Sequence, residues 1–231
     1  MRNLLLAILM LLPALLDAQN ARPVRCRFLS FGGTGPAMSA IAVSDKGTEI
    51  TCPLSSSQLS PQIVCFSKNN TIPFLSSGDK KPLASASIPA GVNAALLVFV
   101  QTPKKAEAAS LSDWKVLVIE DSPKNFPDGG AFVANFYNND IRFVIGEHKG
   151  MLHAGGSFGY AKPEERDSFN MAPVVFEFIQ EDKWHIANES ALRFLPGMRY
   201  LIFAYVDPAS GRPKINTYQD FATPAVTPAA P

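Results

Sequence analysis

The alternation of apolar and polar residues is the feature that most restricts the fold of this chain. Segments 141–145, 174–178 and 184–187 place an apolar residue at every second position, and successive side chains of an extended strand point to opposite faces. After the first residues, no window of eleven or more residues carries an apolar stripe with the 3.6-residue period of a helix. The sequence therefore predicts an all-β protein whose strands each bury one face.

Two runs, 94–100 and 200–206, are apolar on both faces instead of one. A strand can be apolar on both faces only where the sheet is covered on both sides. We therefore expect these two segments to be central strands of covered sheets.

A weak internal repeat links the two halves of the chain. The turn Ile88-Pro89-Ala90-Gly91 precedes the first doubly apolar run, and Leu195-Pro196-Gly197 precedes the second, about 106 residues later. Chance similarity between strand-rich segments is the alternative, but self-similarity at a fixed offset favours a repeat. The repeat predicts two tandem immunoglobulin-like β-sandwich domains, each close to the length at which about seven strands enclose one core.

This organisation divides the chain into four parts. We expect a signal peptide over 1–21, a first sandwich over 22–105, a second sandwich over 112–220, and a disordered tail rich in Pro, Ala and Thr over 221–231. Trp114–Glu120 is the ambiguous segment, because it can pair with either half.

The first residues have the pattern of an export leader. Arg2 precedes an apolar run from Leu4 to Leu16, and the small residue Ala18 follows. The run is too short to cross a bilayer as a stable helix. The expected location is therefore outside the cytoplasm (periplasmic, cell-surface or extracellular), with the leader cleaved and no transmembrane anchor.

Three cysteines follow the leader, so they cannot all pair with one another. Cys26 lies on the apolar face of its segment, beside Val24 and Phe28, and is expected to behave as a small hydrophobic residue. Cys52 and Cys65 would close the shortest loop. An oxidising compartment permits such a bridge without requiring it, so both the thiol and the disulfide forms remain open.

The charge pattern excludes binding driven by a basic surface. Lys and Arg number 21 against 20 Asp and Glu, for a net charge of +1. Small basic groups such as Arg22, Arg25 and Arg27 are scattered and are expected at solvated strand edges. A nucleic-acid partner is therefore not expected.

One motif raises the alternative of a hydrolase. Gly155-Gly156-Ser157-Phe158-Gly159 matches the nucleophile-elbow pattern, with later Asp and His residues in the chain order of a triad. An elbow needs a strand that turns sharply into a helix, and Tyr160-Ala161-Lys162-Pro163 does not begin one. We expect a β-hairpin or a strand edge here and no catalytic residue.

Cofactor and metal sites are likewise not expected. The glycines after Phe31 lack the Gly-Lys-Ser/Thr ending of a phosphate-binding loop. Glu147, His148 and His153 lie close in sequence, but without the helical spacing or cysteine pair of a metal site. A solvated turn explains them better.

Aromatic and polar residues near loops are the remaining candidates for a binding surface. Amphipathic rings suit a platform for a glycan or a peptide, and Tyr218 joins the tyrosines considered for it. The expected partner is an envelope protein or a glycan. The candidate partner-binding residues are Tyr137, Asn138, His148, Tyr160 and Trp184.

A family resemblance is carried by two neighbouring segments. They are Asp121-Ser122-Pro123-Lys124-Asn125-Phe126-Pro127 and Ala131-Phe132-Val133-Ala134-Asn135-Phe136. With its Gly-bearing turns and hydrophobic runs, the chain resembles uncharacterised exported tandem β-sandwich proteins of bacteria. The resemblance implies fold and location and no catalytic residue. We therefore expect an exported, non-enzymatic protein with a binding or envelope-assembly role; the alternative is a secreted serine hydrolase that uses Ser157.

Overall fold

The computed structural model describes residues 21–32, 38–101, 114–207 and 210–221. These residues form sixteen strands and no helix, which confirms the predicted all-β class. The expected signal peptide (apart from residue 21), the whole segment between the expected domains, and the tail from 222 onward lie outside the described residues.

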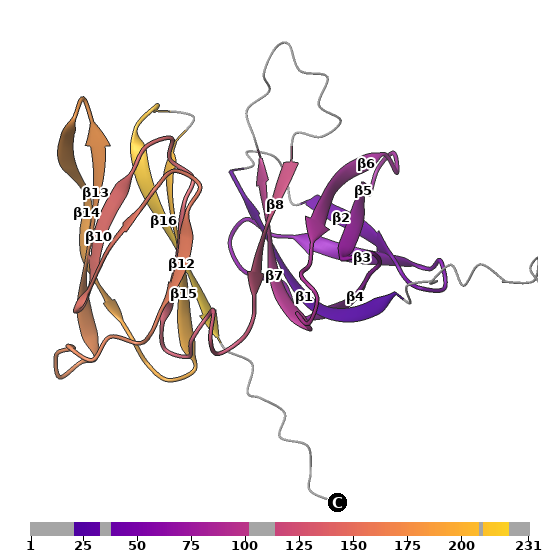
Figure 1. Cartoon of the computed structure of the whole chain (residues 1–231), viewed down its shortest axis with the longest axis horizontal. Helices are drawn as coiled ribbons and strands as arrows, with labels where there is room; N and C mark the ends of the chain where they lie inside the picture. Colours follow the sequence, from indigo (N-terminus) through magenta and orange to yellow (C-terminus); the bar gives the residue numbers. More distant parts are fainter. Residues whose placement is uncertain (1–20, 33–37, 102–113, 208–209, 222–231) are drawn as a thin grey trace, which may run out of the picture.

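The first eight strands belong to the first half of the molecule, on the right of Figure 1. They are β1 (Arg22–Phe31), β2 (Met38–Val43), β3 (Glu49–Leu54), β4 (Ile63–Ser67), β5 (Thr71–Ser76), β6 (Pro82–Ser87), β7 (Ala94–Gln101) and β8 (Trp114–Glu120).

The other eight strands belong to the second half, on the left of Figure 1. They are β9 (Ala131–Asn135), β10 (Ile141–Ile145), β11 (His148–Leu152), β12 (Ser157–Tyr160), β13 (Met171–Gln180), β14 (Lys183–Arg193), β15 (Met198–Val206) and β16 (Pro213–Phe221).

Both halves have the same strand order. In the first half the two sheets are β4-β1-β7-β8 and β3-β2-β5-β6; in the second they are β12-β9-β15-β16 and β11-β10-β13-β14. Each half has one parallel pair, β1 with β7 and β9 with β15, and its other strand pairs are antiparallel. The repeat seen in the sequence thus recurs in the strand order, while common ancestry of the halves stays a prediction.

The glycines of the two repeated turns share a backbone conformation. Gly91 and Gly197 have φ values of 88° and 78°, in the left-handed region that L side chains rarely adopt. An added Cβ would meet no atom within 4 Å at either position. The backbone turn that leads into β7 and β15, and not a lack of space, therefore explains both glycines.

The position of β8 corrects the expected domain boundary. This strand falls in the range 112–220 that the sequence assigns to the second sandwich, but it pairs with β7 from Ala95↔Glu120 to Gln101↔Trp114. Val116 and Val118 pack against the first core. The first sandwich therefore includes Trp114–Glu120.

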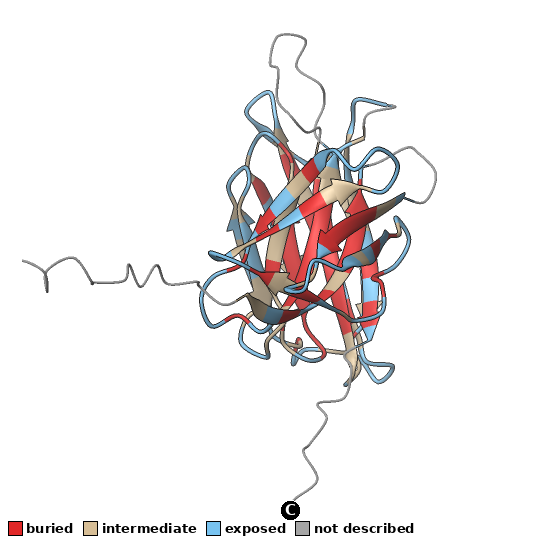
Figure 2. Ribbon diagram, turned by 90° about the vertical axis from the view of Figure 1, so that its right-hand side faces the viewer, coloured by how far each residue is buried: buried red, intermediate tan, exposed pale blue. Residues whose placement is uncertain are grey.

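The four sheets stack as four layers with three hydrophobic cores between them (Figure 1). The first core fills the first sandwich and the second core fills the second sandwich. The third, which we call the shared core, lies between sheet β4-β1-β7-β8 and sheet β12-β9-β15-β16. Figure 2 shows the buried residues along the strands and the exposed residues mainly in the loops.

The shared core explains why two runs are apolar on both faces. Along β7, Leu97 and Phe99 point into the first core, while Leu96 and Val98 point into the shared core. Along β15, alternate residues enter the second core and the shared core in the same way. The prediction that 94–100 and 200–206 are central strands covered on both sides is confirmed.

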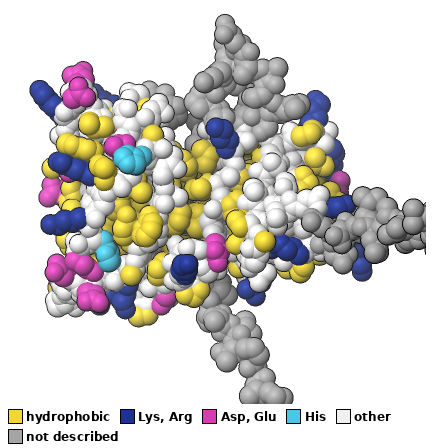
Figure 3. Space-filling model, in the orientation of Figure 1, with side chains coloured by type: hydrophobic (Ala, Val, Ile, Leu, Met, Phe, Trp, Pro, Cys, Tyr) yellow, Lys and Arg dark blue, Asp and Glu magenta, His cyan; other side chains and the backbone are white. Residues whose placement is uncertain are grey.

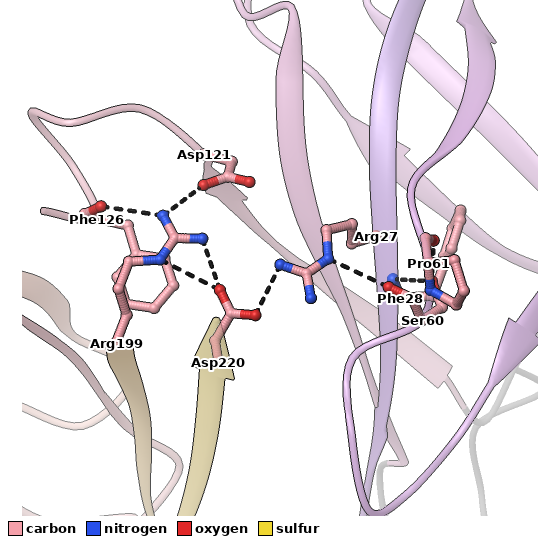
Figure 4. Close-up of polar contacts among 8 residues, drawn as sticks. All are labelled: Arg27, Phe28, Ser60, Pro61, Asp121, Phe126, Arg199 and Asp220. Carbon is pink, nitrogen blue, oxygen red and sulfur yellow. Dashed lines mark hydrogen bonds and ion pairs between the residues drawn. The ribbon is translucent and has the colours of Figure 1, made fainter. Parts of the chain in front are cut away.

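A buried ionic network also joins the halves (Figure 4). Asp220 on β16 is an ion-pair partner of Arg27 on β1, with 2.7 Å between Nη1 and Oδ1, and of Arg199 on β15, with 2.6 Å between Nη2 and Oδ2. Arg199 also pairs with Asp121 at 2.7 Å and donates to the Phe126 carbonyl at 3.2 Å. Arg27 was expected at a solvated strand edge, but its side chain is 14% exposed, because the second half covers it.

Candidate functional site

A groove of about 580 Å³ opens where the two halves meet. The first half contributes the end of β8 and the turn that follows β6. The second half contributes β12 and Phe132 of β9, and Lys124 and Asn125 come from the segment that joins the halves. The site therefore exists only because the two sandwiches pack against each other.

Two edge strands border this groove, one from each half. β8 is the last strand of sheet β4-β1-β7-β8, and β12 is the first strand of sheet β12-β9-β15-β16. Within the part of the chain that the structure describes, each has one strand partner, β7 for β8 and β9 for β12. An edge strand can pair on its outer side with another extended segment. β6 of the opposing sheet packs close to β8, and the turn after β6 lines the groove with it.

The apolar part of the groove is formed by Val118, Phe132 and Phe158. Phe158 is 59% exposed. Its ring lies 5.1 Å from that of Tyr160, which in turn lies 5.3 Å from Phe143 of the second core. Figure 3 shows hydrophobic side chains gathered on the side of the second half that is turned to the viewer. The exposed ring is therefore the outer end of an aromatic row that begins in the core.

Polar groups occupy the other part of the groove. Asn125 Nδ2 donates to Glu120 Oε2 at 2.6 Å, which fixes both side chains. Lys124 and Ser157 also line the groove. Gly159 lets the joining segment approach β12, because an added Cβ would lie 2.0 Å from the Asn125 carbonyl oxygen. The groove thus combines an apolar wall with oriented donors and acceptors.

Ser157 lines the groove but lacks the surroundings of a nucleophile elbow. It is the first residue of strand β12, and no helix follows it among the described residues. The groove lining contains no histidine in the described chain. The nearest histidine in sequence, His153, contacts Asp140, with 3.0 Å between Nδ1 and Oδ1.

The turn near β11 is held by local hydrogen bonds. The carboxylate of Glu147 accepts backbone N–H groups of Glu164 at 2.8 Å and Glu165 at 3.1 Å. Burial raises the pKa of Glu147, but these bonds and the neighbouring His148 outweigh it, so the net pKa is lowered. His148 Nε2 lies 3.0 Å from the Ala161 carbonyl oxygen. No group of three or more potential metal ligands is found in the described ranges.

Tyr137 and Tyr218 lie inside the molecule instead of on a surface. Tyr137 is 9% exposed, packs in the second core and donates its hydroxyl to the Ile179 carbonyl at 3.0 Å. Tyr218 packs in the shared core, where burial raises its pKa to about 12. These two rings therefore do not belong to an exposed platform, because both are buried.

The other predicted binding residues do not form one surface. Asn138 is exposed, and His148 and Tyr160 are half-buried with ring centroids 5.8 Å apart. Trp184 is half-buried beneath the Arg142 guanidinium, which lies 4.6 Å from the ring centroid. Tyr160 of β12 packs against the second core. Trp184 lies on β14, in the other sheet of the second sandwich, opposite Ile179 of β13. The structure brings together His148 and Tyr160 only.

The start of β14 also departs from the expected alternation. Trp184 and Ile186 were expected to bury one face of their strand, but Ile186 is 61% exposed. β14 is an edge strand of sheet β11-β10-β13-β14, and among the described residues no further sheet covers the outer face of that sheet.

The groove itself is the feature that sequence reasoning missed. β8 and β12 are far apart in the chain and meet only through the stacking of two sheets. The one local signal was the Gly155–Gly159 motif, which marks β12 as a strand that another segment approaches closely.

Two further observations bear on function. None of the described residues forms a helix of the length and hydrophobicity needed to cross a membrane. No family model matches the sequence, and no curated protein gives a significant match.

Proposed function

We propose that this is an exported, non-enzymatic binding protein whose groove takes an extended polypeptide segment of an envelope partner. The observation that carries the proposal is the pair of edge strands, β8 and β12, that border the groove. The resemblance to exported tandem β-sandwich proteins and the leader-like first residues support the location.

An extended segment suits this groove better than a glycan does. A polypeptide that lies along an edge strand gains main-chain hydrogen bonds, and pockets for alternate side chains give specificity. Here the Phe158 ring and the Val118 side chain offer apolar contacts, while the hydrogen-bonded Glu120 and Asn125 offer polar ones. A glycan would use the ring but leave the strand edges without a partner.

The walls of the groove are fixed before a partner arrives. The shared core and the ion pairs of Asp220 with Arg27 and Arg199 hold the two halves together. A rigid site loses little conformational freedom on binding. This rigidity supports a binding role for the groove, as in other proteins where a stable scaffold positions loops.

The proposal is tested by site-specific crosslinking in the native host. A photoreactive phenylalanine analogue replaces Phe158 in one variant and Phe169 in a control; Phe169 is 67% exposed but does not line the groove. We expect a crosslinked polypeptide at 158 and none at 169. Equal products at both positions, no product at 158, or a product that is a glycan would refute the proposal.

One observation favours the alternative hydrolase: Ser157 lines the same groove. A fluorophosphonate probe separates the two functions. Labelling of the wild-type protein that disappears in Ser157→Ala would replace the binding proposal with a serine hydrolase.

The immunoglobulin-like character of the sandwiches also remains a proposal. Its support is the size of each half and the two-sheet sandwich. Each half here has two four-stranded sheets with one parallel pair, whereas the constant-type immunoglobulin arrangement has four and three strands.

A further inference from the structure

All three cysteines of the described chain lie in the first core, and each is fully buried. Cys26 on β1 and Cys65 on β4 belong to one sheet of the first sandwich, and Cys52 on β3 belongs to the other. The three side chains therefore meet inside the sandwich, although their strands are separated in the chain.

Cys52 and Cys65 approach each other across the core. Their Sγ atoms are 4.0 Å apart, close enough for a modest rotation of the two side chains to bring them to the bonding distance of about 2.05 Å. A bond at this position would join the two sheets of the sandwich.

Cys26 is not placed to take the same role. In the pairing of β1 with β4, Cys26 is opposite Ile63 and Cys65 is opposite Val24, so the two cysteines are diagonal neighbours. Diagonal neighbours lie about 7 to 8 Å apart, beyond the Cα separation of about 4.4 to 6.8 Å that a disulfide spans. This register therefore disfavours a Cys26–Cys65 bond, although the two side chains are in contact.

We propose that Cys52 and Cys65 form a disulfide that links the two sheets of the first sandwich, and that Cys26 stays a buried thiol. Both thiols lose their protons and together give two electrons to an oxidant disulfide, which is cleaved to two thiols as the Cys52–Cys65 bond forms. The oxidant is a small disulfide such as oxidised glutathione, or the disulfide of a protein oxidant. This inference does not depend on the groove.

The environment of the thiols decides when this bond forms. The hydrogen bond between Cys52 and Cys65, together with burial, raises the pKa of Cys52. A contact with Cys26 and then burial, opposed by the contact with Cys52, raise the pKa of Cys65 to about 12. The thiolate is the reactive form, so these thiols react slowly once the core has closed. Oxidation therefore belongs to folding, before the sandwich is complete.

The experiment refolds the purified chain with a glutathione redox couple or with reductant alone. Residues 47–68 contain both Cys52 and Cys65 and no internal Lys or Arg, whereas Cys26 lies between Arg25 and Arg27. Trypsin therefore releases the proposed bond inside one peptide. We expect this peptide to be lighter by two hydrogen atoms after oxidative refolding, and the denatured protein to alkylate at Cys26 alone.

Stability gives a second, independent measurement. A disulfide that closes a loop of this length should raise Tm by roughly 6 to 12 °C for a chain of this size. The rise should persist in Cys26→Ala and vanish in Cys52→Ala and in Cys65→Ala. Three alkylated cysteines after oxidative refolding, a bond that includes Cys26, or an unchanged Tm would each overturn the proposal.

Discussion

Replacement of Asp220 by Asn tests whether the ionic network holds the two halves together. Asp220 is 2% exposed and is the only carboxylate between Arg27 and Arg199 in the described network. The substitution keeps the shape of the side chain and removes its charge. Arg27 would then keep one side-chain hydrogen bond, from Nε to the Ser60 carbonyl at 3.2 Å.

The expected cost follows from burial and from the remaining partners. Removal of one partner of a buried ion pair costs about 3–5 kcal/mol, because it leaves an uncompensated buried charge. Arg199 retains Asp121 and lies over the Phe126 ring at 4.0 Å, so we expect the lower end, about 3 kcal/mol. For a chain of this size this corresponds to a fall in Tm of roughly 6 to 12 °C.

Urea unfolding measures this loss as a lower urea concentration at the midpoint of unfolding, while the slope of the unfolding free energy against urea concentration stays constant. Arg27→Met isolates the contact between the halves, and a double-mutant cycle with Asp220→Asn should give a coupling energy of about 1.5 kcal/mol or more. Asp79→Asn, which removes the exposed Asp79–Lys81 pair, is the control and should leave the midpoint close to unchanged. A loss in Asp220→Asn no larger than that of the control, or fully additive mutations, would refute the reasoning.

Three further substitutions probe the shared core, the outer sheet and the groove. Phe203→Ala removes a fully buried ring 5.0 Å from Phe31 and should cost about 3–5 kcal/mol in urea unfolding, whereas the exposed Phe221→Ala should cost less than about 0.5 kcal/mol; similar losses would contradict the shared core. The Arg142 guanidinium lowers the pKa of Glu177 below its ordinary 4.5, so the stability that this pair adds is fully present above pH 4.5 and is lost as pH falls through the lower folded-state pKa. The Tm difference between wild type and Glu177→Gln should therefore shrink with acidification below pH 4.5, and a difference that grows would show that the sign is wrong. Gly159→Ala would place a Cβ 2.0 Å from the Asn125 carbonyl oxygen and should lower Tm by several degrees, while Gly78→Ala, with a nearest atom at 3.9 Å, should have little effect; equal Tm values would mean that the joining segment does not press on β12.

The sequence predicts the strands well because period two is a local property. Ile141, Phe143 and Ile145 are all buried, as their alternation indicates. The doubly apolar run 94–100 likewise reports local burial on both faces. The matching turns at Gly91 and Gly197 record a backbone requirement that neighbouring residues alone impose.

The candidate site could not be predicted, because it depends on which sheets stack. Alternation separates two faces of a strand but does not tell which face another sheet will cover, so Tyr137 looked suited to a surface and Phe158 to a hairpin. In the sequence, Arg27 and Asp220 look like solvated charges. Each is paired with an opposite charge on a strand that is distant in the chain. Contacts between strands of different halves leave no spacing pattern in the chain.

The shared core has a consequence for biosynthesis. Sheet β4-β1-β7-β8 buries apolar residues on both faces, yet the strands that cover Leu96 and Val98 are made later. A nascent chain that ends before β15 exposes the apolar residues of this sheet, because the sheet that covers them has not been completed. Truncated products should therefore aggregate or recruit chaperones, and neither half should survive as an independent, well-behaved fragment.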